Sequence, residues 1–131
     1  MPYHKSPAVI IRSLDFAEWD KLITFFTRDY GKLKGVAKGA KRSRKRFGSA
    51  LEPLTYTTVS FFEKERAQLV RLDRCEIIES FPQIHVDVLR VGYASYLGEL
   101  INEMVAEREA NRELFYLFIS FLSSLLYTSD A

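Results

Sequence analysis

The sequence of 131 residues contains a single cysteine, Cys75, and this scarcity excludes two kinds of stabilising site. One cysteine can form no internal disulfide, and it cannot begin the Cys-x-x-Cys pair of a structural zinc site. A reducing cytosol is therefore the expected compartment. The chain also lacks a charged-then-apolar leader and any uncharged run of about 18 residues, so we expect neither a signal peptide nor a membrane-spanning helix.

Groups suited to catalysis are equally scarce. The two histidines, His4 and His85, are far apart in the sequence, and each is expected to be a surface or capping residue. The single cysteine lies among apolar neighbours in a strand pattern and is expected to be unreactive. Glu99, Glu103 and Glu107 repeat at four-residue steps, but without histidine partners such a helix face is expected to be solvated. The sequence thus predicts no catalytic site, no metal site and no cofactor, and we expect that the protein is not an enzyme.

What the chain has in excess is positive charge in one segment. Residues 28–46 carry nine basic side chains against one acid, Asp29, whereas the remainder holds ten basic and 16 acidic groups. The net charge is only +2, so this concentration indicates a polyanionic partner that is met at one place. Hydrophobic residues make up 47% of the chain and aromatic residues 14%, which is enough for a packed core.

The first part of the chain has the texture of strands. Five segments are rich in β-branched and aromatic residues, and they span 8–16, 21–28, 32–38, 53–63 and 68–79. The tripeptide Asp-Tyr-Gly between the second and third segments predicts a tight hairpin. A one-residue slip in the apolar phase of the fifth segment predicts a bulge near Asp73. Together these features predict a five-stranded OB-fold barrel over residues 1–81.

Residues 82–131 have helical spacing and predict the first helices of an all-α domain, left incomplete. One helix is expected over 86–107, with an apolar stripe of Leu89, Tyr93, Tyr96 or Leu97, Leu100 and Met104. A second helix is expected over 114–126, with Asn111 as its N-cap and Glu113 in its first turn.

The second helix is apolar on nearly every side, and such a helix must be surrounded. One further helix and a small barrel cannot bury all of the apolar surface of this helix, so we expect that the chain belongs to a longer protein. In this chain we expect an exposed patch that promotes association, formed by Leu114, Phe115, Phe118, Ile119, Phe121 and Leu122. The final segment, "LLYTSDA" (125–131), is similar to a translated sequencing-library adapter, so it is interpreted as non-native.

The alternation of side chains along a strand predicts the face on which each residue of the third strand lies. It puts Lys32, Lys34 and Lys38 on one face of the third strand and Leu33, Gly35 and Ala37 on the other. The loop that follows has no apolar period and is expected to be mobile. A charged strand followed by a charged loop suits a phosphate chain. The predicted DNA-binding residues are Arg28, Lys32, Lys34, Lys38, Lys41, Arg42, Arg44, Lys45 and Arg46, and the candidates for stacking on bases are Tyr30 and Phe47.

Other interpretations of these residues stay open. A basic run is often only a solvated surface, and similar tracts serve as nuclear localisation signals. Aromatic residues fill the cores of small barrels more often than they stack on bases, and the expected core residues are Trp19, Phe25 or Phe26, and Phe61 or Phe62.

Several segments, taken in order, resemble the RecO family of bacterial DNA repair proteins. The resemblance begins with "AVIIRSLDFAEWDKLITFFTRDYGKLKGVAKGAKRSRKRFG" and continues through "LEPLTYTTVSFFEK", "LDRCEIIESFP", "YASYLGELINEM" and "NRELFYLF". It covers about residues 5–122. Each motif alone is weak, but their order and spacing together are specific.

The resemblance implies a recombination mediator that binds single- and double-stranded DNA without sequence preference and anneals complementary strands. It implies work with RecR, and help in loading RecA recombinase on DNA covered by single-stranded DNA-binding protein. The implied location is cytoplasmic and nucleoid-associated, with no membrane partner. The family often carries a four-cysteine zinc site, which would lie beyond this chain. The alternative hypothesis is a protein-docking module in which the helical segment works and the basic loop is only solvating.

Overall fold

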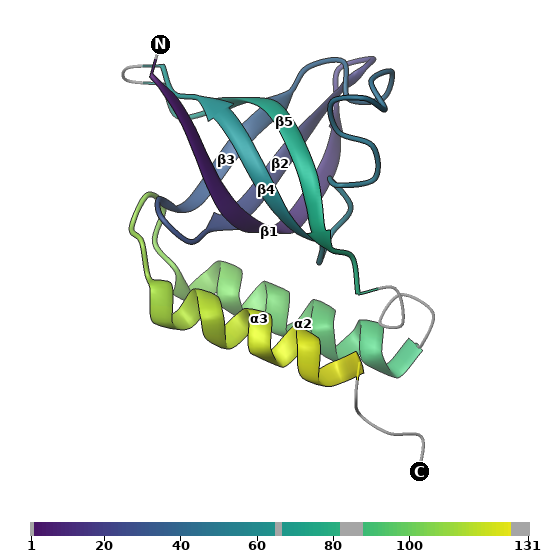
Figure 1. Ribbon diagram of the computed structural model, residues 1–131, viewed down its shortest axis with the longest axis vertical. Coiled ribbons are helices and arrows are strands. Elements are labelled where there is room, and N and C mark those ends of the chain that lie inside the picture. Colours follow the sequence, from purple (N-terminus) through teal and green to yellow (C-terminus); the bar gives the residue numbers. More distant parts are fainter. Residues whose placement is uncertain (1, 65–66, 82–87, 127–131) are drawn as a thin grey trace.

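Five strands close into a barrel, and two helices lie side by side against its outer wall (Figure 1). The computed structural model describes residues 2–64, 67–81 and 88–126. The strands are β1 (Tyr3–Phe16), β2 (Asp20–Thr27), β3 (Gly31–Ala37), β4 (Tyr56–Phe62) and β5 (Val70–Glu79). Their order around the barrel is β1-β2-β3-β5-β4, with β3 and β5 parallel and the other pairs antiparallel. The predicted OB-fold is confirmed.

Strand β1 begins at Tyr3, earlier than the predicted start at residue 8, because it pairs with two neighbouring strands. Its first half pairs with β4, from Tyr3 opposite Phe62 to Val9 opposite Tyr56, and its second half pairs with β2. Strand β4, in turn, begins later than expected. Leu54 has a positive φ of 66° and its backbone N–H donates to the Ile10 carbonyl at 2.7 Å, so the chain turns there before the strand starts.

The bulge predicted near Asp73 is confirmed. Ser60 of β4 pairs with Arg74 and the next residue, Phe61, pairs with Leu72, so Asp73 is the extra residue on β5. The extra residue lets Leu72 and Cys75 both point into the barrel, where both are buried.

The tight hairpin between β2 and β3 is also confirmed. The Thr27 hydroxyl accepts from the Tyr30 N–H at 2.9 Å and donates to the Gly31 carbonyl at 2.7 Å. Gly31 has a φ of 75°, and a Cβ there would lie 2.4 Å from the backbone oxygen of Glu109. Only glycine fits, because the hairpin packs directly on the connection between the two helices.

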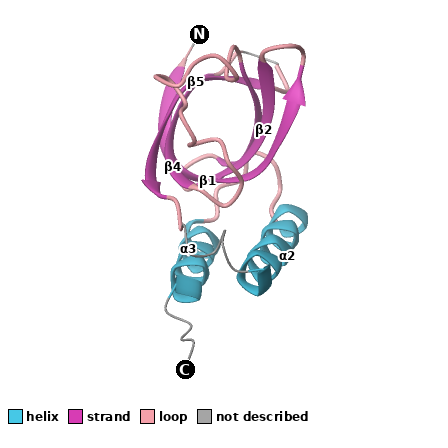
Figure 2. Cartoon of the chain, turned by 90° about the vertical axis from the view of Figure 1, so that its right-hand side faces the viewer, coloured by secondary structure: helices cyan, strands magenta, loops and turns pink. Residues whose placement is uncertain are grey.

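Alternate residues of the first strands serve two separate cores. Ile10 and Phe25 point into the barrel, whereas Val9 and Phe26 point outward to the helices. Figure 2 shows this second interface between the barrel wall and the two helices. Both phenylalanines of the second strand are therefore core residues. Phe61 is also buried, but Trp19 is 39% exposed, so its predicted place in the core is wrong.

The helices are α2 (Val88–Met104) and α3 (Arg112–Leu126). The Asn111 Oδ1 accepts from the Leu114 N–H at 3.0 Å, which confirms the predicted N-cap of α3. The expected exposure of Phe115, Phe118 and Leu122 is wrong, because all three are buried against the outer barrel wall. Residues 127–131 of the segment interpreted as non-native lie outside the described residues, whereas its first residue, Leu125, is buried within α3.

The apolar stripe predicted for the first helix lies mostly outside the core. Tyr96 is 71% exposed, and Leu89, Tyr93 and Met104 are exposed with it. The helix instead buries Ala94, Gly98 and Ile101, and Gly98 lies beside the Leu54 side chain. The face of the helix that packs on the barrel is therefore not the predicted stripe.

Candidate nucleic-acid interface

The predicted alternation along β3 is confirmed. Leu33, Gly35 and Ala37 are buried, whereas Lys34 and Lys38 are exposed and Lys32 is half-buried. The nine predicted basic residues nevertheless do not form one continuous surface. They divide into a group beside the helical connection and a group on the loop that follows β3.

Arg28 belongs to a structural ion-pair network. Its Nε and Nη2 donate to the two carboxylate oxygens of Asp29 at 3.0 and 3.1 Å, and Arg112 of α3 donates to the same carboxylate at 2.6 Å. The hydrogen bond from Arg28 lowers the pKa of Asp29, and the same bond raises the pKa of Arg28. This network ties the β2–β3 hairpin to α3, so Arg28 is already engaged.

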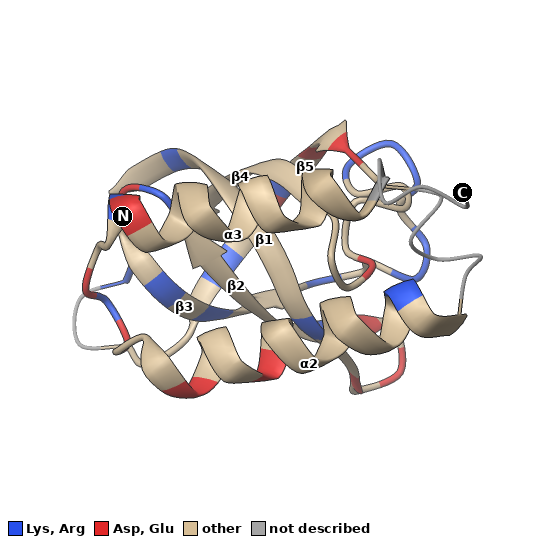
Figure 3. Cartoon of the chain, turned by 90° about the horizontal axis from the view of Figure 1, so that it is seen from below, with Lys and Arg blue, Asp and Glu red and all other residues tan. Residues whose placement is uncertain are grey.

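The first two lysines of β3 also face the helices. The Lys32 Nζ donates to the backbone carbonyl of Asn102 at 2.8 Å. The Lys34 Nζ lies 3.7 Å from a carboxylate oxygen of Glu107. In Figure 3 acidic residues lie along α2, and part of the charge of β3 is therefore balanced within the chain.

The loop between β3 and β4, residues 38–55, is anchored to the barrel and is not the free loop that its composition suggested. Phe47, Ala50 and Leu51 of this loop are buried in the barrel core. Its backbone is also held, because the Lys41 N–H donates to the Trp19 carbonyl at 3.1 Å and the Cys75 N–H donates to the Arg46 carbonyl at 3.0 Å. Sequence analysis identified the charged residues of this loop but did not predict that its apolar residues are buried in the barrel core.

The cations of the loop differ in the contacts that their side chains make within the described part of the protein. Arg46 is structural, since its guanidinium donates to the carbonyls of Asp73 at 3.0 Å and Lys38 at 3.3 Å. Lys41 pairs with the exposed Asp15 at 3.1 Å, and Arg42 lies over the ring of Trp19. The side chains of the remaining three have no hydrogen bond or ion pair to any residue that the structure describes, and they are Lys38, Arg44 and Lys45. Figure 3 shows Lys and Arg gathered on this loop.

The two predicted stacking residues are not open platforms. Phe47 is 2% exposed and belongs to the barrel core, so the prediction that it stacks on a base is wrong for this structure. Tyr30 is half-buried, with its ring centroid 5.7 Å from that of Phe61 and 4.8 Å from that of His4. The exposed rings near the loop are instead those of Phe16 and Trp19. They lie at the ends of the β1–β2 turn, which contacts the loop directly, because the Lys41 N–H donates to the Trp19 carbonyl and the Arg42 guanidinium lies over the Trp19 ring.

Comparison with known proteins identifies the family of this chain. Residues 1–81 match the family model described as "Recombination protein O N terminal", and residues 85–131 match the one described as "Recombination protein O C terminal". The chain belongs to the RecO family. Its predicted resemblance to that family is thereby confirmed.

Individual RecO proteins are similar along most of this chain. It is 42% identical over 122 residues to the DNA repair protein RecO of Koribacter versatilis, which covers 93% of the chain and 50% of the relative. The RecO of Syntrophus aciditrophicus is 40% identical over 119 residues, or 91% and 46% of the two chains. That of Pelotomaculum thermopropionicum is 34% identical over 131 residues, or 100% and 50%. The chain thus spans about half the length of these relatives.

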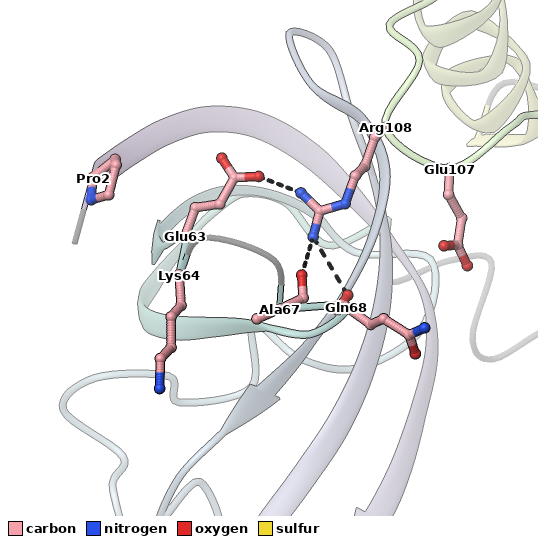
Figure 4. A pocket seen from close by; sticks show the side chains of 7 residues that line it. All are labelled: Pro2, Glu63, Lys64, Ala67, Gln68, Glu107 and Arg108. Atoms are coloured by element: carbon pink, nitrogen blue, oxygen red, sulfur yellow. Dashed lines mark hydrogen bonds and ion pairs between the residues drawn. The ribbon is translucent and has the colours of Figure 1, made fainter.

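One arginine outside the basic segment holds the two parts of this RecO chain together (Figure 4). Arg108, in the α2–α3 connection, pairs with Glu63 and donates to the carbonyls of Ala67 at 3.1 Å and Gln68 at 3.4 Å. Its own N–H donates to the Lys32 carbonyl at 3.0 Å. These contacts fix the β4–β5 connection to the helices. Sequence analysis missed Arg108, because a single arginine in a charged turn has no distinguishing pattern.

The one cysteine is buried in the barrel core. Burial raises the pKa of the Cys75 thiol to about 12, so this cysteine is a poor nucleophile. No group of three His, Cys, Asp or Glu side chains in the described ranges could hold a metal ion. His4 lies 3.2 Å from Glu63, and His85 lies outside the described residues. No helix in the described part of the chain is long and apolar enough to cross a membrane.

Proposed function

We propose that this RecO-family chain binds single- and double-stranded DNA, without sequence preference, through the loop that follows β3. One observation carries the proposal. Lys38, Arg44 and Lys45 lie exposed, without side-chain partners among the described residues, on a backbone anchored in the barrel core. Unpaired cations on a fixed backbone are suited to a phosphate chain, because binding breaks no existing ion pair and need not order the backbone.

Two further cations of the loop can join them. Lys41 pairs with an exposed carboxylate, and Arg42 is held only by the ring of Trp19. Surface contacts of these kinds are weak, so both side chains can exchange their present partners for phosphate oxygens. The arginines can also donate two hydrogen bonds to one phosphate. The remaining predicted residues, Arg28, Lys32, Lys34 and Arg46, support the fold first and contribute to the positive field.

Strand annealing and mediator activity follow from the same chemistry. Shielding the phosphates of two strands lets them approach each other, and no bond is made or broken. The role that we propose is accordingly non-enzymatic and needs no cofactor. We further propose the family's partners, RecR and single-stranded DNA-binding protein, with RecA recombinase served indirectly, and a cytoplasmic, nucleoid-associated location. Residues 1–81 would form the DNA-binding domain and residues 82–131 the start of the helical domain.

A second candidate function is protein docking by the helical segment. The observation that favours it is an apolar groove of about 280 Å³ between α2 and α3, where Leu100, Met104, Leu117 and Phe121 retain exposed surface. In this alternative the basic loop only keeps the protein soluble, so the affinity for DNA would not depend on the loop's cations.

The proposal is tested by fluorescence anisotropy with labelled single strands and duplexes of unrelated sequence. We expect binding to all of them at low salt, and affinities for different sequences of the same strandedness that differ by less than the roughly tenfold contributed by one base-specific contact. We also expect faster annealing of two complementary labelled strands. No binding at low salt, or a strong preference for one sequence, would contradict the proposal.

A further inference from the structure

A groove at the seam between β3 and β5 lies beside the basic loop. Its volume is about 370 Å³, within the range of small-molecule sites. Three cations and several apolar side chains line it, drawn from four strands, the loop that follows β3 and the β4–β5 connection. Sequence analysis did not predict this groove, because the residues that form it are widely separated along the chain.

The groove exists because the barrel closes over a short distance. Strands β3 and β5 pair only at Gly35 opposite Val70 and Val36 opposite Arg71. A Cβ on Gly35 would lie 2.3 Å from the Leu72 side chain, so glycine is required for even this contact. Beyond Val36 no strand pairing joins β3 to β5 in the described chain, and their side chains line an open seam.

The walls of the groove combine a ring, apolar surface and positive charge. Phe16 is 43% exposed and Leu69 is 38% exposed. The cations are Lys38, Lys64 and Arg71, all exposed and without side-chain partners among the described residues. The one described acid, Asp20, already accepts a hydrogen bond from the Gly39 N–H at 2.8 Å.

We propose that this groove holds one unpaired base of a single-stranded nucleic acid, stacked on Phe16, with the flanking phosphates on Lys38, Lys64 and Arg71. This inference rests on the proposed DNA-binding function. A bare polyanion would need no exposed ring, and a protein tail would have to be acidic to match the three cations. A paired base cannot enter, because its faces are covered by its neighbours in the duplex. The groove therefore favours single strands, without sequence preference, since every base has a face that can stack.

The test compares three labelled probes of equal length, namely oligothymidylate, an abasic deoxyribose-phosphate strand and a duplex. Wild-type protein should bind oligothymidylate about tenfold more tightly than the abasic strand, the effect expected of one stacked base. Phe16→Ala should remove most of that preference and leave duplex and abasic binding unchanged, whereas Phe16→Trp should keep it. The double substitution Lys64→Ala and Arg71→Ala should weaken binding to both single-stranded probes.

Two controls separate this inference from the function on which it rests. Leu14→Ala removes an exposed apolar side chain from the same strand and should change no affinity. Leu69→Ala removes another exposed apolar side chain from the lining of the groove and should lower the preference even if Phe16→Ala proves unstable on thermal melting. Equal wild-type affinity for oligothymidylate and the abasic strand would overturn the groove and leave DNA binding intact. Failure of wild-type protein to bind any probe at low salt would overturn the proposed function itself.

Discussion

The guanidinium of Arg42 lies over the indole ring of Trp19, with its central carbon 3.5 Å from the ring centroid. This contact joins the basic loop to the β1–β2 turn, where the Lys41 N–H also donates to the Trp19 carbonyl. A cation–π contact at an exposed site contributes only about 0.5–1 kcal/mol, so the guanidinium can leave the ring for a phosphate. The contact thus orients the loop, and the guanidinium of Arg42 stays available for a phosphate.

The single tryptophan should report the departure of Arg42. We expect its emission to change when the chain is titrated with oligothymidylate, because the ring loses its cation. The variant Arg42→Ala should have altered emission before any DNA is added, and a smaller change during titration. Identical titrations of the two proteins would show that Arg42 does not move to the strand.

Removing the free cations of the loop should weaken DNA binding far more than removing cations elsewhere. The variant Lys38→Ala, Arg44→Ala, Lys45→Ala loses three phosphate contacts, which corresponds to roughly a hundredfold loss of single-strand affinity at 0.1 M salt.

The matched control is Lys5→Ala, Arg12→Ala, Arg90→Ala, which removes the same charge from β1 and α2. It should keep most of its affinity, since charges beyond about 10 Å are largely screened at this ionic strength. Equal losses in the two triple variants, measured by anisotropy, would contradict a localised site. Arg12 gives up only a half-exposed pair with Glu99, which contributes little to stability. Lys64 is an unsuitable control because it lines the groove, and Arg108 and Arg112 are unsuitable because they hold the β4–β5 connection and the β2–β3 hairpin to the helical part.

Arg108 should stabilise the junction between barrel and helices. Arg108→Ala loses the ion pair to Glu63 and the bonds to two carbonyls, and it should lower the free energy of unfolding by about 1–2 kcal/mol in urea denaturation. Arg108 has a φ of 64°, which glycine adopts without strain. Arg108→Gly should therefore be more stable than Arg108→Ala by roughly 1 kcal/mol. The reverse order of stabilities would show that the positive φ at this position does not strain an alanine enough to affect the free energy of unfolding.

Acid should weaken the contact between the β2–β3 hairpin and α3. The pKa of Asp29 is lowered from its ordinary value of 3.8, chiefly by the hydrogen bond from Arg28. Stability from this ionised group is present above that ordinary value and is lost as the pH falls through the lowered pKa. Asp29→Asn should therefore be less stable than wild type at pH 7, with the difference shrinking towards pH 2. Glu99→Gln, which breaks a half-exposed pair with Arg12, should have a smaller effect at pH 7.

The uncovered helix face should cause self-association. Leu117 and Met104 are exposed beside the α2–α3 groove, and their replacement by Glu and Lys should raise solubility and lower the binding of apolar dyes. Phe118 is buried, so Phe118→Ala should instead cost about 3–5 kcal/mol of stability. A monodisperse wild-type monomer that binds no dye would contradict this description of the surface.

Local patterns predicted much of this structure, and contacts between distant residues account for what was missed. The slip of phase at Asp73 is visible in one strand, and the alternation of Lys34 and Lys38 with buried neighbours follows from the period of a strand. The burial of Phe47 depends instead on its packing against barrel residues that are distant in the sequence. The face of α2 that packs, with Ala94, Gly98 and Ile101 buried, depends on the barrel wall that it meets, which no local hydrophobic pattern records.

The most direct test of the central claim is the salt dependence of single-strand binding in wild type and in the loop triple variant. Five loop cations predict a slope of log affinity against log salt at least as steep as about −3.5, from about −0.7 per phosphate contact. The variant lacking Lys38, Arg44 and Lys45 should have a slope about 2 units shallower. A wild-type slope near zero, or the same slope in both proteins, would contradict the assignment of this loop as the DNA-binding surface.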